Sequence, residues 1–179
     1  MVETGSASSG GDHMSADIVK NWPMIQAHFR RTIQSSRFYT FATINPDGSP
    51  HVAPYASLVL NDDCTGFYSD VFPNQMSRNL KADPRICIVA VRMGFGLWFK
   101  AIFSGRFIGW PGIRLYGTVG PSRKGTTKEI DRWRRRMKRF KRMKGYKILW
   151  ADVSTVRDIQ FQRFEPVHLG TMTRHLVTQ

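Results

Sequence analysis

The chain has 179 residues, a formal net charge of +14 and 41% hydrophobic residues. This length suits a single domain with one buried core. Residues 1–13 contain almost nothing apolar, so they cannot act as the apolar segment of a secretory signal. We expect residues 1–13 to be an expression remnant or a disordered tail, with Met14 as the natural start and residues 14–179 as the domain.

The composition also argues against a membrane span and a disulfide framework. The most hydrophobic window, Phe95 to Trp110, is interrupted by Lys100, Arg106 and three glycines. A membrane-spanning helix needs roughly 20 apolar residues in succession. Cys64 lies in a polar turn and Cys87 in an apolar run, which is not the pattern of a disulfide scaffold. These features favour a reducing, cytoplasmic location.

The first predicted element is an amphipathic helix from Asp17 to Ser35. Its apolar residues lie three or four positions apart and form a single stripe. They are Ile18, Trp22, Ile25, Phe29 and Ile33. Because proline lacks the N–H group that a helix needs, the sequence also allows a helix that begins near Pro23.

Short strands and tight turns follow this helix. The expected order is a strand at Phe38–Ile44, a turn at Asn45–Gly48, a strand at Val52–Leu60, a strand at Gly66–Ser69, a short helix at Met76–Leu80 and a strand at Ile86–Val91. Pro46-Asp47-Gly48 has the residue types of a tight hairpin turn. The short helix is expected to stop at Ala82-Asp83-Pro84, because the residue before proline avoids helical dihedral angles.

The second half of the chain continues the pattern and adds a basic helix. A strand is predicted at Ile113–Val119, closed by Gly120-Pro121, and two more at Tyr146–Val153 and Val156–Phe164. Thr126 or Thr127 is the predicted N-cap of a helix over residues 126–144. Short, closely spaced strands predict a mainly β fold with flanking helices, arranged as an antiparallel barrel.

The elements from Phe38 to Val91, with their punctuating residues, resemble the FMN-binding split barrel of the pyridoxamine 5'-phosphate oxidase-like proteins. The resemblance extends to about Val119 and agrees more weakly to Val153. It implies an antiparallel split β-barrel, a homodimer with FMN at its interface, and an oxidoreductase that acts on a small, planar or hydrophobic substrate. Because FMN carries the redox step, no catalytic side chain is implied.

The resemblance also implies three groups of cofactor-binding residues. They are Ala53, Tyr55, Ala56 and Ser57 against the flavin ring, Tyr68 and Ser69 near the phosphate, and Gln75, Met76, Ser77, Arg78 and Asn79 at the helix start that holds the phosphate. Unpaired N–H groups and the helix dipole favour an anion at such a helix start.

Two positions depart from the family pattern. The phosphate-binding lysine of the family falls on Met76, and the arginine of the vitamin B6 oxidases falls on Gln75. A charge-assisted hydrogen bond contributes about 1.5–3 kcal/mol, so other groups must replace those two. Arg78, Ser77, Asn79 or a basic residue of a second subunit are the candidates. The C-terminal residues also lack the tryptophan and arginine pattern of those enzymes, so pyridoxamine phosphate oxidation itself is not expected.

Two further segments have more than one interpretation. The aromatic segment Met93–Phe103 is either a subunit interface or one wall of a substrate pocket. Ten Lys or Arg lie between Arg132 and Lys147. This basic run is either a solvated face or an attraction site for an anionic molecule. No motif for specific nucleic-acid binding accompanies it, and specific binding to nucleic acid or membrane is the less favoured alternative.

Three other functions remain open. The first is a flavin- or haem-binding protein without turnover, with His168 or His175 as a haem ligand. The second is a deazaflavin-dependent reductase. The third is a basic protein that kept the barrel and lost its cofactor, for which Met76 and Gln75 are the main argument. No metal site is expected, because the sequence has no C-x-x-C or H-E-x-x-H motif.

Overall fold

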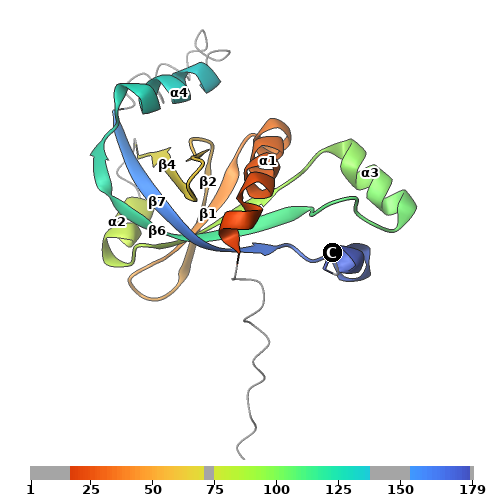
Figure 1. Cartoon of the computed structure of the whole chain (residues 1–179). Helices are drawn as coiled ribbons and strands as arrows, with labels where there is room; N and C mark the ends of the chain where they lie inside the picture. The colour runs from red at the N-terminus through yellow and green to blue at the C-terminus, as the bar shows by residue number, and fades with distance from the viewer. Residues whose placement is uncertain (1–16, 71–74, 138–153, 178–179) are drawn as a thin grey trace, which may run out of the picture.

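A computed structural model describes residues 17–70, 75–137 and 154–177 of the chain (Figure 1). Within these residues, one seven-stranded antiparallel sheet has the order β2-β1-β5-β6-β7-β4-β3. The elements are α1 (Ile18–Ser36), β1 (Tyr39–Ile44), β2 (Pro50–Tyr55), β3 (Val59–Leu60), β4 (Thr65–Ser69), α2 (Gln75–Ala82), β5 (Arg85–Val91), α3 (Phe95–Ser104), β6 (Gly112–Lys124), α4 (Thr127–Met137), β7 (Thr155–Pro166) and a short 3-10 helix (Gly170–Leu176).

The sheet curls around α1 without closing. In the described part of the chain, the end strands β2 and β3 each pair with one neighbour only, β1 and β4 respectively. The long strands β6 and β7 cross the whole molecule, and they separate α4 at one end from α3 at the other (Figure 1). This arrangement confirms the predicted mainly β fold with flanking helices and an open, split barrel.

Helix α1 supplies one wall of the core. The predicted stripe is confirmed: Trp22, Ile25 and Phe29 are buried, and the two remaining members of the stripe pack against the core at its edge. The helix begins at Ile18, where the Asp17 side chain accepts a hydrogen bond from the backbone N–H of Lys20 at 3.0 Å. The alternative start near Pro23 is therefore wrong, because this cap stabilises a turn that precedes the proline.

Two predicted strand boundaries are also wrong. The predicted strand Val52–Leu60 is two strands, β2 and β3, which lie at opposite edges of the sheet. Residues 56–58 carry the chain between those edges, so no continuous strand can form. Strand β6 runs through Gly120-Pro121 to Lys124, and its register with β7 shifts between Val119 and Ser122. Such a bulge accommodates Pro121, which has no N–H group to donate.

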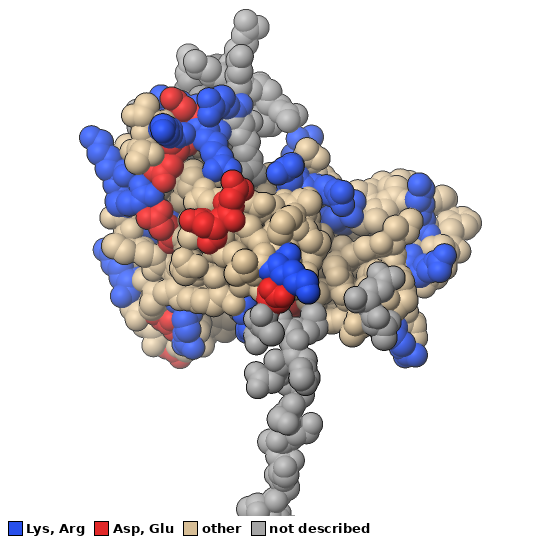
Figure 2. Space-filling view, in the orientation of Figure 1, with Lys and Arg blue, Asp and Glu red and all other residues tan. Residues whose placement is uncertain are grey.

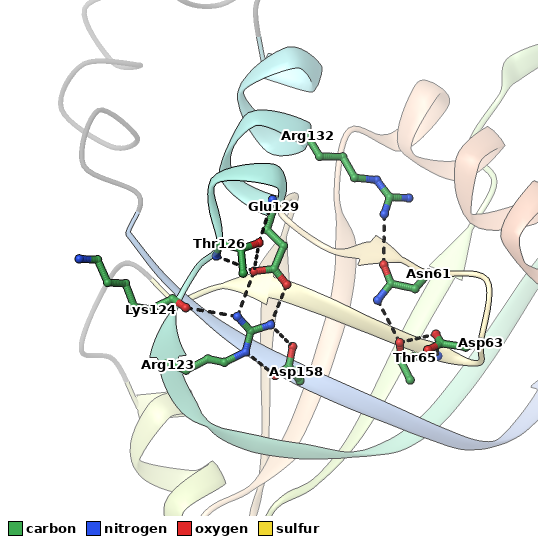
Figure 3. A network of polar contacts seen from close by, with 9 residues as sticks. All are labelled: Asn61, Asp63, Thr65, Arg123, Lys124, Thr126, Glu129, Arg132 and Asp158. Carbon is green, nitrogen blue, oxygen red and sulfur yellow. Dashed lines mark hydrogen bonds and ion pairs between the residues drawn. The ribbon is translucent and has the colours of Figure 1, made fainter.

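Helix α4 is fixed to the sheet by a polar network (Figure 3). Thr126 and Glu129 form a reciprocal capping box, with the Glu129 N–H donating to Thr126 Oγ1 and the Thr126 N–H donating to Glu129 Oε2. The Arg123 guanidinium on β6 donates to both Glu129 and Asp158, at 2.7 and 2.5 Å. These hydrogen bonds from Arg123 lower the pKa of Glu129 to about 2. The network therefore fixes the first turn of α4 against strands β6 and β7.

The basic helix is confirmed up to Met137. Its predicted continuation to residue 144 and the predicted strand Tyr146–Val153 lie outside the described residues. The last predicted strand is confirmed as β7. Among the described residues, no helix combines the length and apolar character that crossing a bilayer requires.

Candidate functional site

The end of β4 is the point at which the predicted cofactor-binding residues converge. The Ser69 N–H donates to Ser57 Oγ at 3.2 Å, which joins the end of β4 to the segment after β2. The ring centroids of Tyr55 and Tyr68 lie 5.6 Å apart. Ala53, Ala56 and Ser57 are all partly exposed. The fold therefore places the ring-side group of residues next to the β4 pair.

Tyr68 and Ser69 carry hydroxyl groups with no hydrogen-bond partner among the described residues. Both side chains are buried, with exposed fractions of 0% and 7%. Burial is the main reason that the pKa of Tyr68 is raised, so this phenol keeps its proton at neutral pH and is available as a donor. A buried hydroxyl without a partner costs about 1–3 kcal/mol, and native proteins contain few of them.

The start of α2 is held against the end of β1 by side-chain amides. Asn79 is fully buried and donates to Thr43 Oγ1 at 3.1 Å and to Asn45 Oδ1 at 2.8 Å. Gln75 donates to Asn79 Oδ1 at 2.8 Å and accepts from the Arg78 guanidinium at 2.7 Å. Asn79 is therefore occupied within the protein, whereas Arg78 is exposed and can be reached by an anion.

The side chains of Met76 and Ser77 are both buried. The Met76 side chain is 1% exposed and belongs to the hydrophobic core. Its burial explains how an apolar residue can stand where the family pattern has lysine. Ser77 Oγ donates to Asp70 Oδ1 at 2.6 Å. The prediction that the residues at positions 75–79 bind phosphate therefore depends mainly on Arg78 and on the backbone of the helix start.

A buried ion pair beside these residues was not predicted from the sequence. Arg157 Nε on β7 donates to Asp70 Oδ2 at 2.6 Å, with exposed side-chain fractions of 4% and 7%. The Thr155 hydroxyl also donates to the Asp70 carbonyl at 2.7 Å. Arg157 lies directly opposite Tyr68 in the sheet register. The alternation of Arg157, Ile159 and Phe161 was the available signal, since it places the arginine on the buried face of the strand.

The C-terminal histidines lie elsewhere in the molecule. His168 contacts the Trp110 ring edge-on, with centroids 5.0 Å apart. A ring nitrogen of His175 lies 2.9 Å from the carbonyl oxygen of Phe107. Both belong to the end of the sheet that carries α3, whereas α2 lies at the other end (Figure 1). The fold therefore does not bring either histidine to the residues around β4.

Comparison with protein-family models gives one decisive match. A family model described as pyridoxamine 5'-phosphate oxidase matches residues 25–160, which is most of the chain. This chain belongs to the pyridoxamine 5'-phosphate oxidase family. The match begins within α1 and spans the strands β1 to β6 and every residue of the candidate site. No curated protein sequence matches this family member significantly.

Several solved structures share the fold of this chain. The HupZ protein of Group A Streptococcus is 19% identical with a TM-score of 0.52, and the match covers 81% of this chain and 98% of HupZ. An FMN-binding protein from Syntrophomonas wolfei is 17% identical with a TM-score of 0.50, covering 85% and 95% of the two chains. A proposed pyridoxamine 5'-phosphate oxidase from Listeria innocua is 10% identical with a TM-score of 0.53, covering 81% and 96%. At these identities the likeness shows the fold of this family member and nothing finer.

Proposed function

We propose that this chain is an FMN-dependent oxidoreductase that acts on a small, hydrophobic substrate and works as a homodimer. Two buried hydroxyls, those of Tyr68 and Ser69, carry the proposal: they lack a hydrogen-bond partner among the described residues and lie at the position that the family pattern assigns to the flavin phosphate. Oxygen atoms of a bound cofactor would provide the missing partners. Family membership and the FMN-binding structural neighbour support the choice of flavin.

The residues around β4 fit FMN. The small side chains of Ala53, Ala56 and Ser57 leave a partly exposed surface on which a flat ring can approach the backbone. The exposed Arg78 guanidinium supplies positive charge beside the helix start. Bound FMN supplies the electron transfer, and the protein contributes binding, orientation and the exclusion of water. The Tyr68 phenol, with its raised pKa, stays protonated, so its O–H group can donate to an anionic oxygen of the cofactor.

The open edge of the sheet supports the proposed dimer. Strand β2 pairs only with β1 in the described residues and presents Pro50, Val52 and Pro54 on an exposed face. A second copy placed against this edge would cover both the face and the ring-side residues, as the family resemblance implies. Sedimentation velocity of the full chain measures the assembly, and a monomer at all concentrations would contradict the dimer.

Replacing Ser69 with alanine separates cofactor binding from folding. Because the Ser69 hydroxyl has no partner in the described protein, we expect Ser69→Ala to leave the unfolding midpoint in urea unchanged or slightly higher. The same change is expected to weaken FMN binding about tenfold, since one hydrogen bond to the cofactor is lost. Flavin fluorescence titration measures the affinity. Equal FMN affinity in parent and variant would remove Ser69 from the site.

Removing the Arg78 charge is expected to have a larger effect on FMN affinity. A charge-assisted hydrogen bond contributes about 1.5–3 kcal/mol, so Arg78→Ala should weaken FMN binding by roughly 10- to 100-fold. Lys81→Ala is the matched control, because Lys81 is an exposed cation on the same helix, in its last turn. If both variants lose affinity equally, a general field effect and not a phosphate contact is responsible.

The visible absorption spectrum of the purified protein, before and after adding FMN and desalting, tests the whole proposal. A retained two-band flavin spectrum supports it, and consumption of a nicotinamide reductant distinguishes an enzyme from a flavin-binding protein without turnover. A Soret band would favour haem instead. Binding of deazaflavin with rejection of FMN would favour a deazaflavin-dependent reductase, and refusal of both would favour the loss of cofactor that Met76 and Gln75 suggest.

A further inference from the structure

Helix α3 exposes an apolar surface at the end of the molecule away from the candidate flavin site (Figure 1). We call its exposed residues the α3 patch. They are Met93, Phe95, Phe99, Ile102, Phe103 and Ile108. Phe95 is 85% exposed and Ile108 82%, values at which a side chain gives almost no stability to the core. Contiguous apolar surface of this kind marks an interaction site.

The patch belongs to a firmly held helix. Trp98 packs edge-on against the buried Phe107 at 5.2 Å, and its indole N–H donates to the Arg92 carbonyl at 2.8 Å. Ala101 is also buried on this inner side of α3. The Phe107 N–H in turn donates to the carbonyl of Met172 in the 3-10 helix. The outer side of α3 is therefore presented in a fixed orientation, not exposed by a loose turn.

The outer side has a regular aromatic row. Phe95, Phe99 and Phe103 follow one another at four-residue spacing, with neighbouring ring centroids 5.9 and 4.5 Å apart. This spacing places the three rings along one face of a helix. A ten-residue helix is about 15 Å long, so the row forms an apolar strip along the whole helix.

The charges around the patch identify what can cover it. No Asp or Glu occurs between Asp83 and Glu129, whereas Arg92, Lys100 and Arg106 lie in or beside α3. Figure 2 shows Lys and Arg at the rim of this end of the molecule and no acidic side chain on its visible face. Two copies facing each other through this patch would bring cations together without carboxylates to pair them. An anionic surface with an apolar interior complements it instead.

We propose that the α3 patch docks the protein onto an anionic lipid bilayer. Helices that lie in a membrane interface combine a row of Phe or Leu side chains with flanking Lys or Arg. The apolar side chains enter the region of the acyl chains, and Lys100 and Arg106 bind the negatively charged headgroups. This role is independent of the cofactor, and it differs from both the interface and the pocket-wall interpretations of the aromatic segment.

Vesicle flotation of the full chain tests the proposal. We expect the protein to float with phosphatidylcholine vesicles that contain phosphatidylglycerol, and to remain in solution with phosphatidylcholine alone. The double variant Phe95→Ser/Phe103→Ser should lower partitioning at least about tenfold, because two large apolar side chains no longer leave water. Val19→Ser is the matched control, since Val19 is an exposed apolar residue on α1. The near-UV circular dichroism of the variants shows that the fold is kept.

A second pair of variants separates α3 from the basic helix. Lys100→Gln/Arg106→Gln is expected to reduce binding to the anionic vesicles about tenfold, whereas Arg134→Gln/Arg135→Gln on α4, with the same loss of charge, should leave it unchanged. Equal losses in both pairs would overturn the proposal, because the net charge would then be responsible. Absence of vesicle binding, together with a dimer that Phe95→Ser/Phe103→Ser dissociates, would also overturn it and assign the patch to a second copy.

Discussion

Replacing Arg157 with methionine is expected to lower the free energy of unfolding by about 3–5 kcal/mol. The change leaves the Asp70 carboxylate buried, with Ser77 as its remaining side-chain donor, and an uncompensated buried charge is costly. Because Asp70 directly follows Ser69 of β4 and accepts a hydrogen bond from Ser77 of α2, the same variant should also lose FMN affinity. Urea unfolding and flavin titration measure the two effects.

The control for Arg157 lies on the same strand. Arg163 pairs with Glu165, and both side chains are substantially exposed. Arg163→Met is therefore expected to cost about 1 kcal/mol or less. The double variant Asp70→Asn/Arg157→Met should recover part of the stability lost by Arg157→Met, since no unpaired charge remains. If Arg157→Met unfolds at the same urea concentration as the parent, the ion pair does not stabilise this end of the barrel.

Acidification from pH 7 to pH 4 is expected to destabilise the fold by about 3 kcal/mol through His28 alone. Burial is the main cause that lowers the pKa of His28 from 6.5 to about 4, although its hydrogen bond to the Ala90 carbonyl acts in the opposite direction. The nearby cations Arg92 and Arg31 lower this pKa further. Between pH 6.5 and pH 4, His28 is therefore protonated in the unfolded chain and neutral in the folded chain. The contribution of the neutral His28 to the free energy of unfolding is complete above pH 6.5 and decreases as the pH falls towards 4.

Two variants isolate the histidine from the other acid-sensitive groups. His28→Gln keeps an N–H donor for the Ala90 carbonyl and does not titrate, so the unfolding free energy should become much less dependent on pH between 6.5 and 4. Thr32→Val is the matched control, because Thr32 is buried one helical turn later and its hydroxyl has no partner among the described residues. It should keep the pH dependence of the parent. A parent protein whose urea midpoint is constant across this window would contradict the buried, neutral His28.

The sequence predicted those helices, strands and turns whose formation depends on residues close together in the chain. The apolar stripe of α1, the turn at Asn45–Gly48 and the stop at Asp83-Pro84 each depend on neighbouring residues, and the structure confirms all three. The break between β2 and β3 was missed, because a run of β-forming residues does not show that its two halves pair with strands at opposite edges of the sheet. Pro121 favours a strand end in the local sequence, whereas a bulge in β6 accommodates it.

The candidate site was also predicted only in part. Family resemblance pointed to the residues around β4 and α2, and the fold does bring Ser57, Tyr55 and the β4 residues together. The resemblance did not reveal that Met76 is a core residue, that Asn79 is hydrogen-bonded to Thr43 and Asn45, or that two hydroxyls at the end of β4 lack partners in the part of the chain that the structure describes. These properties depend on contacts between residues more than thirty positions apart in the chain.

The sequence by itself therefore determined the family, the helices α1 and α2, the start of α4 and most of the strands, because these follow from short-range periodicity and turn chemistry, whereas α3 was not predicted as a helix. Only the tertiary structure decided that Arg157 pairs with Asp70, which lie 87 residues apart and meet because β7 pairs with β4. Likewise, only the structure decided that α3 turns its row of phenylalanines outward. An apolar sequence looks the same whether it is buried or exposed, and the packing of Trp98, Ala101 and Phe107 on the inner side settles which residues remain in contact with solvent.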